Sequence, residues 1–137
     1  MDSFIRGGLK LGFLYIAIGG ALGAVMRYWM SGFAHRYTSG AFPLGTLTVN
    51  LAGSLIIGLL WAVSEVTIIS QNIRLFAFIG ILGSFTTFST FSLENFNLLR
   101  DGEYGLFFLN AALSLFLGLA LVFAGYAMGR YLTGLTR

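Results

Sequence analysis

The sequence predicts an all-α integral membrane protein with four transmembrane helices, and two observations support this fold class. Apolar residues make up 57% of the 137 residues and charged residues only 9%, whereas a soluble domain carries about 25% charged residues. Segments without charge cover residues 37–64, 75–93 and 104–129, and a fourth apolar segment surrounds Arg27 near the N-terminus. Because about 20 apolar helical residues cross a bilayer core of about 30 Å, each segment is long enough to span it.

We expect the four helices at about residues 9–34, 45–66, 73–99 and 106–132. The connections between them are short and hold much of the remaining charge, including Glu65, Asp101 and Glu103. The chain is therefore predicted to form a single four-span membrane domain over residues 1–137, without a soluble part.

Several classes of function find no support in the composition. The chain has no cysteine, which excludes disulfides and thiolate metal sites. Its eight Lys and Arg residues are scattered rather than interleaved with aromatic residues, so we expect no nucleic-acid partner. Paired carboxylates, a Ser-His-Asp set and a phosphate-binding loop are all missing, so we expect no enzyme activity. The partner that the sequence does predict is the lipid bilayer.

The third apolar segment is the most informative part of the sequence. Residues 83–92 read Gly-Ser-Phe-Thr-Thr-Phe-Ser-Thr-Phe-Ser, so five hydroxyl residues follow Ser84 near the middle of a span. Consecutive threonines and glycines are poor helix formers, so a break in the helix is expected here. Transport proteins use such breaks to present carbonyls to cations and helix N-termini to anions. The residues alone leave open a continuous helix whose hydroxyls bond to the preceding turn.

Three phenylalanines in this segment, Phe85, Phe88 and Phe91, recur every three residues. Such a stripe is typical of ordinary packing on one helix face. The edge of an aromatic ring is electropositive, so the same rings could instead contact an anion.

Polar side chains also fall inside the second and fourth segments. Asn50 follows Thr46 by four residues, a spacing that puts both on one helix face. Asn110 and Ser114 show the same spacing in the fourth segment. Each amide could make a hydrogen bond between helices, or it could donate to an anion in a water-filled pathway.

Arg27 lies toward the end of the first segment. Its side chain could reach the lipid headgroups at the membrane surface. Alternatively, its charge could draw anions into a vestibule.

Three sequence blocks carry a resemblance to a known family. They are residues 19–28, Gly-Gly-Ala-Leu-Gly-Ala-Val-Met-Arg-Tyr, residues 45–50, Gly-Thr-Leu-Thr-Val-Asn, and residues 83–92 given above. Through these blocks the chain resembles the fluoride channel family (Fluc, also called CrcB) over essentially its whole length. The resemblance implies passive export of fluoride from the cytoplasm through the plasma membrane of a prokaryote. It also implies an antiparallel homodimer with dual topology and two pores, each formed by both subunits.

The resemblance further implies roles for particular residues. Fluoride would contact the ring edges of Phe88 and Phe91, and Asn50 would correspond to the pore asparagine of the family. The backbone carbonyls of Gly83 and Thr86 would hold a structural Na⁺ at the dimer centre. The remaining expected positions are the hydroxyl-lined track at Thr46, Ser89 and Thr90, the vestibule residue Arg27, and pore-facing polar groups at Asn110 and Ser114.

Two other functions remain as alternatives. A small proton-coupled multidrug exporter also has four spans and dual topology, but it needs an ionisable acid within a span, and the sequence places Glu94 at a span end. A non-conducting membrane assembly protein would show no ion flux. It would also leave the hydroxyls and phenylalanines of the third segment without a purpose.

Overall fold

The computed structural model of the chain describes residues 2–36 and 40–134, and for residues 2–10 it describes the backbone only. The described part is helical and contains four helices long and apolar enough to cross a membrane, at Leu11–His35, Leu44–Val66, Gln71–Arg100 and Tyr104–Leu132. The predicted all-α architecture with four membrane-spanning helices is therefore confirmed.

The first two spans are single helices, α1 (Asp2–His35) and α2 (Leu44–Val66). The third comprises α3 (Gln71–Arg74), the π-helical η1 (Leu75–Leu82), α4 (Gly83–Phe85) and α5 (Phe88–Arg100). The fourth comprises α6 (Tyr104–Ala112), the π-helical η2 (Leu113–Leu117) and α7 (Gly118–Leu132). Most helices begin a few residues before the predicted bounds, because an apolar window marks only the part of a helix that lipid surrounds.

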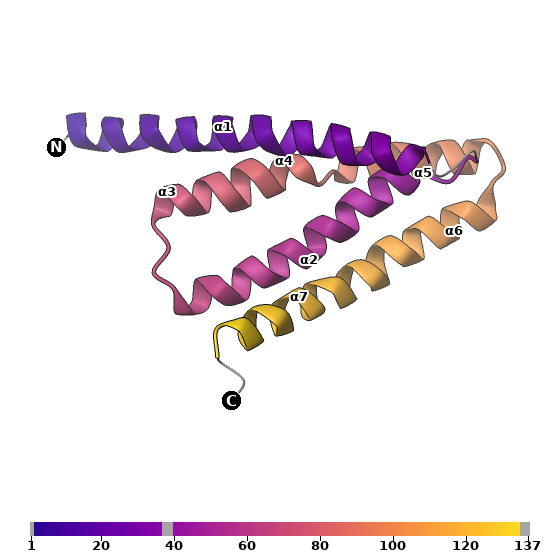
Figure 1. Cartoon of the computed structure of the whole chain (residues 1–137). Coiled ribbons are helices and arrows are strands. Elements are labelled where there is room, and N and C mark those ends of the chain that lie inside the picture. The colour runs from indigo at the N-terminus through magenta and orange to yellow at the C-terminus, as the bar shows by residue number, and fades with distance from the viewer. Residues whose placement is uncertain (1, 37–39, 135–137) are drawn as a thin grey trace.

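The spans run up and down, so that connections alternate between the two ends of the molecule (Figure 1). The N-terminal end of α1, the connection from α2 to α3 and the C-terminal end of α7 lie at one end. The connections from α1 to α2 and from α5 to α6 lie at the other. Only 11–33% of the residues in the most apolar windows of the four spans are buried within the chain. Most side chains of these windows are consequently available to lipid or to another subunit.

Small residues bring the helices together in two pairs. The most extensive contacts join α2 to α7 and α1 to η1. A Cβ atom added at Gly23 of α1 would overlap the carbonyl of Ile81, and one added at Gly125 of α7 would overlap the carbonyl of Leu55. Such close backbone approach is how membrane helices associate when lipid removes the hydrophobic driving force.

The backbone of the third span leaves the helical conformation at two residues. Thr86 has φ −81° and ψ 154°, and Thr87 has φ −148° and ψ 115°, both in the extended region. α4 ends directly before these residues and α5 begins directly after them. Thr87 serves as the N-cap of α5, because its side chain accepts a hydrogen bond from the amide of Thr90.

Candidate functional site

One face of α2 follows the third span across this non-helical point. Thr46 Oγ1 donates a hydrogen bond of 2.6 Å to Glu94 Oε1 on α5. One turn later Asn50 bonds to Thr87, and a Cβ atom added at Gly53 would overlap the Thr86 side chain. The helical spacing that the sequence predicts for Thr46 and Asn50 thus places both against the third span.

Asn50 makes two hydrogen bonds to the backbone of a single residue. Its Nδ2 donates to the carbonyl oxygen of Thr87 at 3.2 Å, and the amide of Thr87 donates to its Oδ1 at 2.9 Å. Backbone groups outside a helix need partners where water is scarce. The Asn50 side chain supplies both of them for Thr87.

Three hydroxyl groups gather at the start of α5. Thr87 Oγ1 lies 3.2 Å from Ser89 Oγ and 3.0 Å from Thr90 Oγ1, and it accepts from the Thr90 amide at 3.3 Å. Hydroxyl groups and the N-terminal end of a helix both offer hydrogen-bond donors to an anion. The structure therefore groups Ser89 and Thr90, two of the predicted track residues, at a place suited to negative charge.

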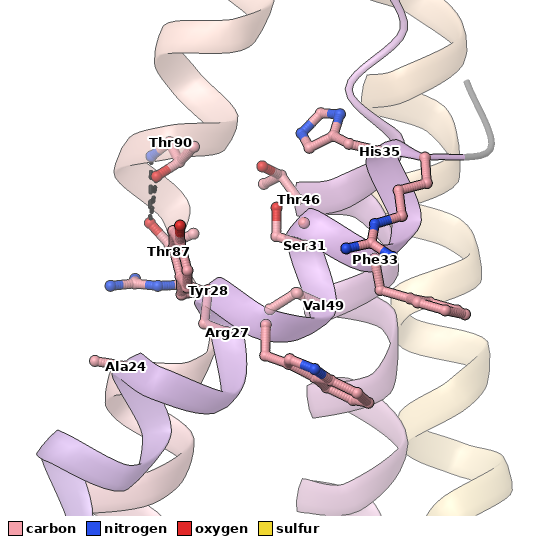
Figure 2. Close-up of a pocket in the computed structure, with 13 residues that line it drawn as sticks. Ala24, Arg27, Tyr28, Ser31, Phe33, His35, Thr46, Val49, Thr87 and Thr90 are labelled. Carbon is pink, nitrogen blue, oxygen red and sulfur yellow. Dashed lines mark hydrogen bonds between the residues drawn. The ribbon is translucent and has the colours of Figure 1, made fainter. Parts of the chain in front are cut away.

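A cavity of about 830 Å³ opens beside this cluster. Figure 2 shows Thr87 and Thr90 on one side of it, with Thr46, Ser31 and His35 on the other. Arg27 from α1 also lines the cavity. Arginine charge in a cleft raises the local concentration of anions. The predicted vestibule residue thus shares one cavity with Thr46 and Thr90, two of the predicted hydroxyl residues.

A second cavity, of about 380 Å³, also borders Thr87. Its lining includes Asn50, Gly83, Thr86 and Phe88, and Thr87 lines both cavities. The non-helical point of the third span consequently contributes to both the basic cavity and a cavity lined by both of the predicted sodium-binding residues.

Phe88 and Phe91 lie next to each other at the start of α5. Their ring centroids are 5.7 Å apart and the rings are inclined by 37°. The Phe88 side chain is 79% exposed in the single chain, and Phe91 is half-buried. The positive edge of an exposed phenylalanine ring is available for contact with an anion.

Asn110 and Ser114 do not join this group within the chain. Asn110 is only 1% exposed and donates to Asn95 Oδ1 at 3.3 Å, while Asn95 Nδ2 donates to the carbonyl of Phe91 at 2.8 Å. Ser114 Oγ is buried without a hydrogen-bond partner among the described residues. The Asn110 side chain thus joins α6 to α5 by a hydrogen bond. Asn95 links it in turn to the backbone of Phe91.

Sequence reasoning missed three residues that the structure places here. Thr87 precedes Thr90 by three, which is the spacing of a helix N-cap and could have identified it. Asn95 follows Phe91 by four, which puts it on the same helix face. His35 stands alone in the sequence, and no sequence signal connects it to the cavity that it lines.

Glu94 lies on α5 within the third span, Gln71–Arg100, which ends close to the predicted bound at residue 99. Its Oε1 accepts the hydrogen bond from Thr46.

Comparison with known families finds a match over most of the chain. The model of the family described as CrcB-like protein, camphor resistance (CrcB), matches residues 14–126, which is most of the chain. The chain belongs to this family. The three sequence blocks that carry the resemblance, at residues 19–28, 45–50 and 83–92, all lie inside the matched region of this CrcB-like chain.

Curated relatives of the CrcB-like chain carry a more specific name. A protein of Thermus thermophilus is 45% identical over 122 residues, covering 89% of this chain and 96% of the relative. One of Geobacter sulfurreducens is 47% identical over 120 residues, covering 87% and 97%. One of Parabacteroides distasonis is 44% identical over 115 residues, covering 84% and 90%. All three are named fluoride-specific ion channel FluC.

Proposed function

We propose that this multi-pass membrane protein is a fluoride-specific ion channel that passively exports fluoride from the cytoplasm and so relieves fluoride toxicity. The observation that carries the proposal is the agreement of its relatives: proteins 44–47% identical over nearly the whole chain are all named as such channels. Their name describes conduction rather than catalysis. The proposal extends that function to this chain.

The arrangement of side chains supports an anion pathway along α5. Arg27 attracts fluoride into the larger cavity, where the Thr90 hydroxyl offers a donor in place of water. Thr46, whose own hydroxyl donates to Glu94, lines the same cavity. Ser89 lies within the same hydroxyl cluster. Fluoride then passes the ring edges of Phe88 and Phe91, whose centroids lie 5.7 Å apart. A neutral ring edge binds an anion without the long residence that a fixed positive charge would cause.

We further propose that two copies of the chain assemble as an antiparallel homodimer in the plasma membrane of a prokaryote. The low burial within the single chain supports this assembly, since exposed helix faces are available to a second subunit. The exposed Phe88 ring would then lie against groups of the partner, and each of the two pores would be completed by both subunits.

A structural Na⁺ at the dimer centre fits the residues that would hold it. Thr86 is one of the two non-helical residues and Gly83 lies three residues before it. Both residues line one cavity. Carbonyl oxygens are the hard ligands that a hard cation prefers. When bound, the ion would hold carbonyls of the two subunits together.

The other functions find less support. A proton-coupled exporter needs an acid in a span, and Glu94 does lie in one, but none of the relatives cited above is named as an exporter. A non-conducting assembly protein has no use for the hydroxyl cluster beside Arg27.

A growth experiment tests the proposal in cells. Expression of this chain in a bacterium that lacks its own fluoride exporter should restore growth in medium containing fluoride, because passive efflux lowers cytoplasmic fluoride. The same strain with an empty vector serves as the control. Growth that stays as fluoride-sensitive as in the control, with the protein present in the membrane, would contradict the proposal.

A further inference from the structure

The hydrogen-bonding pattern of an α-helix shows what is unusual about the third span. In a continuous helix each amide donates to the carbonyl four residues before it. The Gly83 carbonyl would then accept from the Thr87 amide, and the Thr86 carbonyl from the Thr90 amide. These two carbonyls are the ones expected to face a sodium ion.

Both amide donors are directed to side chains instead. The Thr87 amide donates to Asn50 Oδ1 at 2.9 Å, and the Thr90 amide donates to Thr87 Oγ1 at 3.3 Å. Among the backbone hydrogen bonds of the described residues, neither amide donates to Gly83 or Thr86. Two side chains therefore replace the two carbonyls as acceptors.

The Asn50 side chain is held in place for this task. Its Nδ2 donates to the Thr87 carbonyl at 3.2 Å, so both polar ends of the amide contact one residue. One turn further along α2, Gly53 allows close approach, since a Cβ atom there would overlap the Thr86 side chain. Phe85, the last residue of α4, is buried beside this point, at 3% exposure.

We propose that Asn50 and Thr87 form a backbone clamp: they are positioning residues that withhold the Thr87 and Thr90 amides from the helix and so keep the Gly83 and Thr86 carbonyls available to a cation. This inference rests on the proposed function for the identity of that cation, Na⁺. It gives Asn50 a task beyond that of a pore donor. One N–H of its amide group remains available, because the clamp uses only one of the two.

The clamp is tested by titrating purified wild-type protein in detergent with sodium chloride and recording its thermal stability. N-methylglucamine keeps the ionic strength constant. The variant Asn50→Leu keeps the shape of the side chain but removes both hydrogen bonds, and Thr87→Val removes the hydroxyl acceptor. The sodium concentration at half-maximal stabilisation should rise at least about tenfold in each variant. The amide that loses its side-chain acceptor would either donate to the Gly83 or Thr86 carbonyl, or leave that carbonyl without a fixed position.

Matched controls separate positioning from a general loss of structure. Thr87→Ser keeps the hydroxyl acceptor and should keep the wild-type sodium midpoint. Thr48→Val and Asn97→Leu make the same chemical changes outside the clamp, and among the described residues Thr48 Oγ1 bonds within its own helix, to the Leu44 carbonyl. Both should also keep the wild-type midpoint, whatever their stability without sodium.

Two results would overturn the clamp. One is a wild-type sodium midpoint in Thr87→Val, or in a folded Asn50→Leu. The other is the absence of any sodium effect on the wild-type protein. A wild-type protein that responds to sodium but passes no fluoride would instead refute the proposed function and leave the clamp intact.

Discussion

Phe88 and Phe91 carry the most specific residue-level claim about conduction. Their rings are neighbours at the start of α5, and Phe88 is the more exposed of the two. An isoleucine at position 88 keeps much of the apolar bulk but has no positive ring edge. We expect Phe88→Ile to reduce fluoride flux to background while the dimer still forms, as measured by fluoride electrode and by size-exclusion chromatography.

A control for this variant lies far from the hydroxyl cluster. Phe13 of α1 is 70% exposed and lines none of the described cavities, so Phe13→Ile should keep wild-type flux. Wild-type fluoride flux in Phe88→Ile would show that the ring edge of Phe88 is not needed for conduction.

At the same scale, the sequence predicts the helix face of a polar residue better than it predicts the residue's hydrogen-bond partner. The four-residue spacing puts Thr46 and Asn50 on one face, and the structure places both against the third span. The partner of Asn50 lies 37 residues away, and spacing reports only neighbours within one helix. Asn110, which the resemblance predicts to face the pore, bonds to Asn95 on α5, and the sequence gives no sign of this partner.

The pairing of α2 with α7 depends on glycine at the element scale. A Cβ atom at Gly125 would overlap the Leu55 carbonyl oxygen, so Gly125→Ala forces the two helices apart. We expect a loss of about 1–3 kcal/mol in the free energy of unfolding, typical of overpacking. Denaturant unfolding in detergent, followed by circular dichroism, measures it.

Gly105 of α6 provides the matched control. Nothing lies within 4 Å of a Cβ atom added there, and alanine favours the helix over glycine by about 1 kcal/mol. Gly105→Ala should therefore be neutral or stabilising. Equal stability of Gly125→Ala and wild type would show that these two helices do not approach as closely as described.

At this scale, the sequence predicts the positions of the spans but not which spans pair. Apolar windows predict all four spans, because lipid imposes the same requirement on each. The small residues of α1 and α2 indicate that helices approach closely there, but not which helix each one meets. The structure shows these partners, with α7 beside α2 and η1 beside α1.

At the scale of the whole molecule, the fold brings residues from three spans together around one cavity, which neither composition nor spacing predicts. Arg27 and His35 come from α1, Thr46 from α2, and Thr87 and Thr90 from the third span, yet all five line one cavity. Thr87 also lines the second cavity, together with Gly83 and Thr86, the residues predicted to hold sodium. The third span thus contributes one residue to both cavities.

Selective conduction of fluoride by the whole protein is best tested by efflux from proteoliposomes. Vesicles loaded with equal concentrations of potassium fluoride and potassium chloride, and supplied with valinomycin to balance charge, are followed with ion-selective electrodes. The reconstituted protein should release fluoride rapidly and retain chloride, because hydroxyl donors and ring edges favour the smaller and more strongly hydrogen-bonding anion. Equal release of both anions, or no release of either, would contradict the proposed function.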